Sequence, residues 1–176
     1  VSGEGLPDLR AALDRAAAET GVRGAAGGFR LSVDRSFTLA GAGTVVTGTV
    51  LSGAVGVGDA VTVSPSGLPA RVRAVHVANR PAARGLVGQR CALNLAGEGV
   101  SKDAVGRGDM VLDPALHAPA DRIDAVLRVL PGEPRAVGDW FPARLHHAGA
   151  EVGARVVPLE GAVAPGGTAR VQLVLD

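Results

Sequence analysis

The chain of 176 residues is long enough for one large domain or two small ones. Apolar residues make up 47% of it but aromatic residues only 2%, so a core would be built from Val, Leu and Ala. The net charge of +1 argues against a strongly basic nucleic-acid-binding surface, though not against a local group of arginines. The 26 glycines and 11 prolines indicate many turns and favour β structure over a helix bundle.

The cysteine content and the apolar runs bear on where the protein works. A single cysteine, Cys91, excludes an internal disulfide framework and is consistent with a reducing compartment. No apolar run reaches the length of a membrane span, and the first residues lack the basic and apolar regions of a signal peptide. We therefore expect a cytoplasmic protein with no membrane partner.

Leucines at helical spacing near the start of the chain predict an amphipathic helix over residues 6–18. Leu6, Leu9 and Leu13 fall on one side of it, and charged residues fill the other side. A helix this short is marginally stable by itself and needs a surface to pack on. Gly and Ala without periodicity follow it, so residues 21–27 are expected to form a linker.

Short apolar or β-branched stretches, separated by Gly, Asp and Pro turns, predict a β barrel or sandwich from residue 28 to about 116. Phe29, Leu31 and Val33 alternate with polar residues and share one face of the first strand. Gly41-Ala42-Gly43 allows a tight reversal after it. The expected strands are Phe29–Asp34, Thr44–Leu51, Ala60–Val63, Ala70–Val77, Gln89–Leu95 and Asp109–Leu112.

A second β unit is expected over residues 117–176. Apolar residues alternate from Ile123 to Val129. The end of this unit, from Arg170 to Leu175, is expected to be an exposed sheet edge. Further strands are predicted at Phe141–His147, Ala150–Pro158 and Thr168–Leu175.

Nucleotide binding by this chain is not predicted. A Walker A loop requires Gly-Lys followed by Ser or Thr, with the lysine on the phosphates. The only lysine, Lys102, lies between Ser101 and Asp103. The Asn-Lys-x-Asp sequence with which GTPases read the guanine base is also absent. We therefore expect neither GTP binding nor enzyme activity in this chain.

Metal and thiol chemistry are not predicted either. There is no His-Glu-x-x-His sequence and no Cys-x-x-Cys pair, so the histidines are expected to be surface or hydrogen-bonded residues. Cys91 alternates with Leu93 and Leu95, which predicts a buried apolar residue rather than a nucleophile. The histidines are His76, His117, His146 and His147.

Charged residues on two of the expected strands are candidates for a functional site. The same alternation that buries Cys91 turns Arg90, Ala92 and Asn94 outward. Asp34 and Arg35 end the first strand of the barrel. By position alone, an Asp beside an Arg at a strand end is a solvated ion pair of little energetic value.

The sequence Gly43-Thr44-Val45-Val46-Thr47-Gly48 resembles the glycine-Thr-Val-x-Thr-Gly strand of the second domain of translational GTPases. With Asp34-Arg35-Ser36-Phe37 before it and Leu51-Ser52-Gly53 after it, the stretch is most similar to the selenocysteine-specific elongation factors. In that family an Asp-Arg after the first strand and the arginine of a Gly-Gln-Arg strand line the aminoacyl pocket. The resemblance assigns these roles to Asp34, Arg35 and Arg90.

The resemblance implies an all-β fold of two consecutive antiparallel β-barrel domains preceded by a short helix. Residues 1–20 would be the C-terminal helix remnant of a G domain, although an ordinary N-terminal helix fits them nearly as well. Residues 21–27 would be a linker, residues 28–116 the aminoacyl-binding second domain, and residues 117–176 an incomplete third domain. If the barrel closes as the family implies, Arg35 and Arg90 lie close together on its outer surface, with Asp34 as counter-charge.

The function implied is delivery of selenocysteinyl-tRNA to the ribosome. The full-length protein would bind GTP and Mg²⁺ in an upstream G domain, and downstream winged-helix domains would bind an mRNA hairpin. One alternative is an elongation factor Tu-like or other translational GTPase. Another is a non-translational β-barrel adaptor or an enzyme, but an enzyme would need convergent polar groups in one pocket, and the sequence offers no clear nucleophile–base pair.

Overall fold

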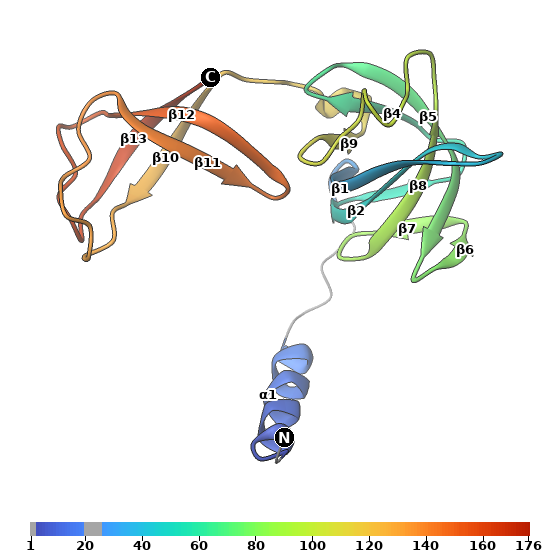
Figure 1. Cartoon of the computed structure of the whole chain (residues 1–176), viewed down its shortest axis with the longest axis horizontal. Helices are drawn as coiled ribbons and strands as arrows, with labels where there is room; N and C mark the ends of the chain where they lie inside the picture. Colours follow the sequence, from blue (N-terminus) through green and yellow to red (C-terminus); the bar gives the residue numbers. More distant parts are fainter. Residues whose placement is uncertain (1–2, 20–25) are drawn as a thin grey trace.

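A computed structural model describes residues 3–19 and 26–176, which form one helix and two β units (Figure 1). The predicted helix is present as α1 (Leu6–Glu19). Its three leucines, Leu6, Leu9 and Leu13, are 56–61% exposed, and no residue of α1 is buried. Within the described residues, the apolar side of α1 therefore packs on nothing. Most of the expected linker lies outside the described residues, and none of the described helices is long and apolar enough to cross a membrane.

The first β unit is a closed antiparallel barrel, as predicted. Its sheet has the strand order β4-β9-β1-β2-β8-β5-β6, and a further pairing of β4 with β5 closes it. The short strands β3 (Ala54–Gly56) and β7 (Arg84–Leu86) form a separate ribbon. The barrel strands are β1 (Arg30–Leu39), β2 (Gly43–Ser52), β4 (Ala60–Ser64), β5 (Leu68–Val77), β6 (Arg80–Ala82), β8 (Arg90–Ala96) and β9 (Met110–Leu112). A 3-10 turn, η1 (Pro114–Leu116), follows β9.

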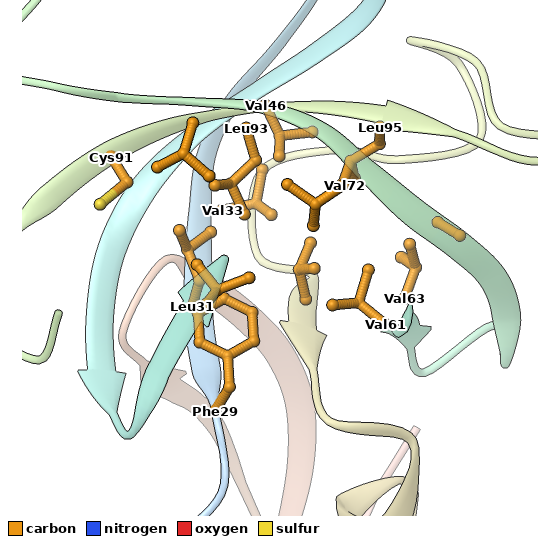
Figure 2. Packing of buried hydrophobic residues seen from close by; sticks show 14 of the residues in the cluster. Phe29, Leu31, Val33, Val46, Val61, Val63, Val72, Cys91, Leu93 and Leu95 are labelled. Carbon is orange, nitrogen blue, oxygen red and sulfur yellow. The ribbon is translucent and has the colours of Figure 1, made fainter. Parts of the chain in front are cut away.

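The barrel core consists almost entirely of Val and Leu side chains (Figure 2). The alternation expected in β1 is confirmed, since Phe29, Leu31 and Val33 are all buried. Cys91 is also buried, at 2% exposure, and its burial raises the pKa of the thiol. Burying one such side chain completely stabilises the fold by about 1.5–3 kcal/mol, which explains how a barrel nearly free of aromatic residues holds together.

Strand β1 is irregular at one residue that matters for the site. Val33 pairs with Gly48 and Arg35 pairs with Thr47, which leaves Asp34 as the extra residue of a β-bulge. The two strands approach so closely here that a Cβ atom at Gly48 would fall on the carbonyl oxygen of Ser32. Only a glycine at position 48 permits this approach beside the bulge.

The second β unit is an antiparallel sheet with the order β10-β13-β12-β11 and a bridge between Val137 and Val163. The expectation that residues 170–175 form a sheet edge is wrong, because β13 pairs with β10 on one side and β12 on the other. In the described residues this unit is an open four-stranded sheet rather than a closed barrel, with β10 and β11 at its edges. The strands are β10 (Arg122–Arg128), β11 (Phe141–His147), β12 (Ala150–Pro158) and β13 (Thr168–Leu175).

Candidate functional site

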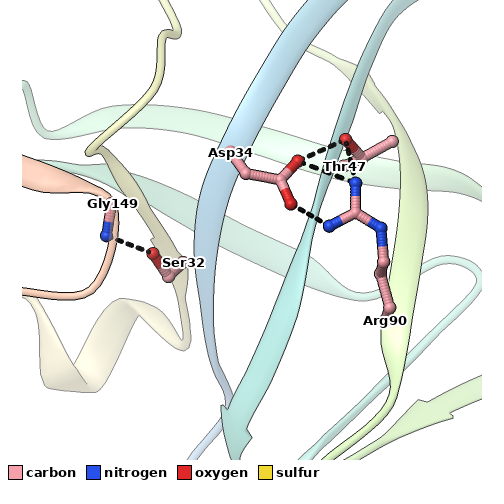
Figure 3. A network of polar contacts seen from close by, with 5 residues as sticks. All are labelled: Ser32, Asp34, Thr47, Arg90 and Gly149. Atoms are coloured by element: carbon pink, nitrogen blue, oxygen red, sulfur yellow. Dashed lines mark hydrogen bonds and ion pairs between the residues drawn. The ribbon is translucent and has the colours of Figure 1, made fainter. Parts of the chain in front are cut away.

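Three strands of the barrel bring a carboxylate, a hydroxyl and a guanidinium together on its surface (Figure 3). Arg90 at the start of β8 forms a two-point ion pair with Asp34: Nη1 contacts Oδ2, and Nη2 lies 3.1 Å from Oδ1. The hydroxyl of Thr47 on β2 donates a hydrogen bond of 2.6 Å to Oδ1 of the same carboxylate. Nη2 of Arg90 also lies 3.4 Å from the Thr47 hydroxyl oxygen.

The backbone explains why these three side chains meet. Arg90 points away from the core because its neighbour Cys91 points into it. The bulge at Asp34 re-aims that side chain along the barrel surface toward β2 and β8, a common use of a bulge near functional sites. Thr47 lies between the two on the intervening strand, where the following residue, Gly48, lets β1 and β2 close up.

The cluster is partly solvated and electrostatically coupled. The side chains of Arg90 and Asp34 are 57% and 34% exposed. Partial burial by itself raises the pKa of Asp34, but hydrogen bonds from Arg90 and Thr47 and the charges of Arg90 and Arg35 outweigh it, so the net pKa of the carboxyl is lowered. The hydrogen bond and charge of Asp34 raise the pKa of Arg90 in turn. Both groups are therefore charged at neutral pH.

Arg35, the third predicted site residue, contributes in a different way. It is exposed and pairs with Thr47 through the β1–β2 ladder. Its side chain makes no hydrogen bond or ion pair with any described residue, but its charge lowers the pKa of Asp34. The structure thus brings Asp34 and Arg90 into direct contact and leaves Arg35 near them with its donors free. The expected closeness of Arg35 and Arg90 stays a prediction.

Thr47 is the member of the cluster that sequence reasoning missed. In the sequence Thr47 is one residue of the Gly43–Gly48 pattern, and a threonine on a β-branched strand is unremarkable by type. The available signal was the alternation along β2: if Val46 faces the core, its neighbour Thr47 faces the surface, and in the structure Val46 is buried and Thr47 half-buried.

A cavity of about 500 Å³ lies on the same face of the barrel. Part of its lining is apolar and comes from Phe37, Leu39 and Val45 of the β1–β2 hairpin, and His76 and Asn79 also line it. A smaller hollow of about 220 Å³ is lined by His76 and Asn79 as well as by Thr47 and Arg90. Because His76 and Asn79 line both hollows, the larger cavity adjoins the hollow that Thr47 and Arg90 line.

Asn94 faces outward as predicted, yet it is not exposed to solvent. It points away from the barrel core, but it is only 8% exposed because the turn at residues 41–43 lies over it. Its Nδ2 donates a hydrogen bond of 2.6 Å to the carbonyl oxygen of Ala42, and Oδ1 is buried without a partner in the described residues. Asn94 therefore fixes the turn that forms one end of the cavity.

Metal sites and the arginines of the second sheet are weaker candidates in the part of the chain that the structure describes. No group of three or more His, Cys, Asp or Glu side chains there could hold a metal ion. Two of the five arginines on the strands of the second sheet form ion pairs, Arg144 with Glu151 and Arg170 with Glu160. The Asp34–Arg90 cluster beside an apolar cavity is therefore the strongest candidate site in the described residues.

Comparison with known proteins supports a translation-factor fold. Residues 43–112 match the family elongation factor Tu domain 2. The chain is 42% identical over 132 residues to the selenocysteine-specific elongation factor of Escherichia coli and 35% identical over 133 residues to that of Haemophilus influenzae. These matches cover 75% and 76% of the chain but only 21% and 20% of the relatives. The chain thus spans about a fifth of their length.

A solved structure extends the likeness to both β units. The crystal structure of a bacterial selenocysteine-specific elongation factor superposes with a TM-score of 0.77 at 24% identity, over 99% of this chain and 28% of that one. The barrel is thus an elongation factor Tu-type second domain, a module of translation elongation factors. Within that class, the chain is similar to the selenocysteine-specific elongation factors over about three quarters of its length.

Proposed function

We propose that this barrel binds the aminoacyl end of selenocysteinyl-tRNA and that Asp34, Arg35 and Arg90 recognise the selenocysteinyl side chain. The observation that carries the proposal is Arg90, whose guanidinium is held by Asp34 and Thr47 while its side chain stays 57% exposed. A guanidinium has more N–H donors than these contacts use, so donors remain for a ligand.

The chemistry of the two competing side chains explains why arginines would be used. A thiol has a pKa of about 8.5, and a selenol is considerably more acidic, so selenocysteine is mostly an anion at neutral pH. The precursor, serine, has an uncharged hydroxyl of similar size. Arg35 and Arg90 together outweigh the charge of Asp34, and this net positive charge favours the anion, which a pocket that measures size alone could not do.

The neighbouring cavity supports the proposal because an aminoacyl group arrives attached to a nucleoside. A hollow of about 500 Å³ lies within the size range of small-ligand sites. Its apolar lining, with Phe37 and Leu39, suits the face of a base, since stacking on apolar and aromatic side chains holds unpaired bases. The terminal nucleoside would lie there and direct its aminoacyl group toward Arg90.

The remaining activities belong to the longer protein. We propose that it acts in the cytoplasm, delivers the tRNA to the ribosome and hydrolyses GTP with Mg²⁺ in a G domain that ends at residues 1–20. Winged-helix domains would bind the mRNA hairpin. Residues 28–116 would be the aminoacyl-binding domain and residues 117–176 part of the next. This chain has no Walker A lysine, so it would hold neither GTP nor Mg²⁺ itself.

The test is equilibrium binding of selenocysteinyl-tRNA and seryl-tRNA to the full-length, GTP-loaded factor. Replacing Arg90 by Ala removes one charge-assisted contact, worth about 1.5–3 kcal/mol. Selenocysteinyl-tRNA should bind roughly ten- to a hundredfold more weakly, while seryl-tRNA changes little. Arg84→Ala, on the separate β3–β7 ribbon, is the matched control and should affect neither tRNA. Equal weakening of both tRNAs by Arg90→Ala would make Arg90 a general RNA contact and end the proposal.

A further inference from the structure

We propose that the β11–β12 turn of the second β unit positions Asp34, so that the orientation of the second unit controls the geometry of the Asp34–Arg90 pair. Gly149 and Ser32 are then positioning residues for the site, although neither belongs to the cluster. This inference deepens the proposed function, and only its tRNA-binding readout rests on that function.

The contact between the two units joins the backbone of Gly149 to the side chain of Ser32 and leaves no room for a side chain at position 149. The N–H of Gly149 donates a hydrogen bond of 3.3 Å to Oγ of Ser32, a buried polar residue of β1 (Figure 3). A Cβ atom at Gly149 would lie 2.9 Å from the carbonyl oxygen of Val33. Any larger residue at position 149 would therefore push the turn away from β1.

The same stretch of β1 is held from a second direction. The N–H of Gly108 donates to the Val33 carbonyl oxygen at 3.0 Å, and the N–H of Val33 donates to the Asp109 carbonyl oxygen at 2.9 Å. Gly108 also touches the second unit, since a Cβ atom there would lie 3.0 Å from Cα of Ala150. Val33 is thus clamped between the 106–109 turn and the β11–β12 turn.

The residue after the clamp is Asp34. As the extra residue of the bulge, it has no partner of its own in the β1–β2 register, so the position of its peptide depends on its neighbours. A shift of Val33 would displace the Asp34 carboxylate relative to Arg90, which is fixed separately on β8. The clamp therefore links the placement of the second unit to the charge cluster on the first.

A clamp that only held the two β units together, without positioning Asp34, would behave differently. Loosening it would lower the free energy of unfolding but leave the Asp34 carboxylate on Arg90, with its pKa still lowered. A positioning clamp changes the electrostatic environment of Asp34 even in a folded protein. The pKa of Asp34 is the readout that separates these two roles.

The experiment compares Gly149→Ala, Ser32→Ala and Gly138→Ala in this chain, with carboxyl carbon NMR titration of Asp34. Gly138 is the matched control, because it lies in the second unit and a Cβ atom there has nothing within 4 Å. We expect Gly149→Ala to raise the Asp34 pKa toward the usual aspartate range, Ser32→Ala to raise it less, and Gly138→Ala to leave it unchanged. Ser32→Ala adds no bulk and so serves if Gly149→Ala does not fold. An Asp34 pKa that stays at the wild-type value in the folded variants overturns the inference.

Binding to the full-length factor separates this inference from the proposed function. If the inference and the proposed function both hold, Gly149→Ala reduces the preference for selenocysteinyl-tRNA over seryl-tRNA, and Gly138→Ala does not. If the Asp34 pKa rises but the preference is unchanged, the clamp stands and the role of the cluster in discrimination fails.

Discussion

Arg90 lies on the carboxylate of Asp34, a residue 56 positions earlier in the chain, at the point where β1 is bulged. This pairing has a consequence for charge recognition. Asp34 offsets the positive charge of Arg90. The net positive charge at the site therefore comes from Arg35, which has no ion-pair partner among the described residues. Arg90 then supplies oriented donors, and Arg35 supplies the net field.

The first prediction follows from these separate roles of Arg90 and Arg35. In the full-length factor, Arg35→Ala should weaken binding of selenocysteinyl-tRNA by about 1 kcal/mol, roughly fivefold, because Arg35 is exposed and its field is screened. Arg35→Lys keeps the charge and should restore most of the affinity. Equilibrium titrations at low and high salt check this, since the loss should shrink as salt rises. A loss in Arg35→Lys equal to that in Arg35→Ala would show that the fork of the arginine matters, not its charge.

The second prediction concerns the pH dependence of stability. The pKa of Asp34 is lowered in the folded state, so its contribution is complete above the unfolded pKa of about 3.9 and is lost as the pH falls through the folded-state pKa. Thr47→Val removes one hydrogen bond to the carboxylate and should raise the pKa, whereas Thr47→Ser should not. NMR titration of Asp34 gives the pKa, and urea unfolding should show Asp34→Asn converging with wild type in acid. A constant difference across that range would contradict the linkage.

How far the sequence predicts this structure depends on the kind of feature. Alternation fixed the faces of Phe29, Leu31 and Cys91 because burial of one strand face is a local property. The sequence did not predict the bulge at Asp34 or the role of Thr47, since both depend on the register between two strands. The error over residues 170–175 has the same origin: β13 follows β12 in the chain, yet its pairing with β10 places it inside the sheet.

The site was predicted less by pattern than by resemblance. By physical reasoning alone, Asp34 and Arg35 were a weak surface pair, and Arg90 was simply an outward residue. Only the closed barrel brings β8 beside β2 and so places Arg90 against Asp34. The burial of Asn94 was also not predicted, because the alternation of β8 gives no sign that the turn at residues 41–43 covers this residue.

The third prediction tests the close approach of β1 and β2. Gly48→Ala would place a methyl group on the Ser32 carbonyl and 2.7 Å from Cδ2 of Leu31, so the strands must separate. We expect a loss of about 1–3 kcal/mol in the free energy of unfolding, as for other overpacked sites. Gly106→Ala is the control, since a Cβ atom there has nothing within 4 Å. Chemical denaturation of both variants measures the difference, and equal stabilities would refute the packing argument.

The last prediction separates the cavity from the charge cluster. Asn94→Ala leaves the partly buried carbonyl of Ala42 without its donor, which costs about 1–3 kcal/mol and loosens the turn at one end of the cavity. If the cavity holds the terminal nucleoside, which both tRNAs share, binding of selenocysteinyl-tRNA and of seryl-tRNA should fall by the same factor. Arg90→Ala, in contrast, should affect only the selenocysteinyl form. Hydrogen exchange at the amide of Ala42, which donates to the Leu39 carbonyl oxygen at 3.0 Å, would confirm that the turn has loosened. A loosened turn with unchanged affinity for both tRNAs would exclude the cavity as the nucleoside site while leaving the arginine mechanism untouched.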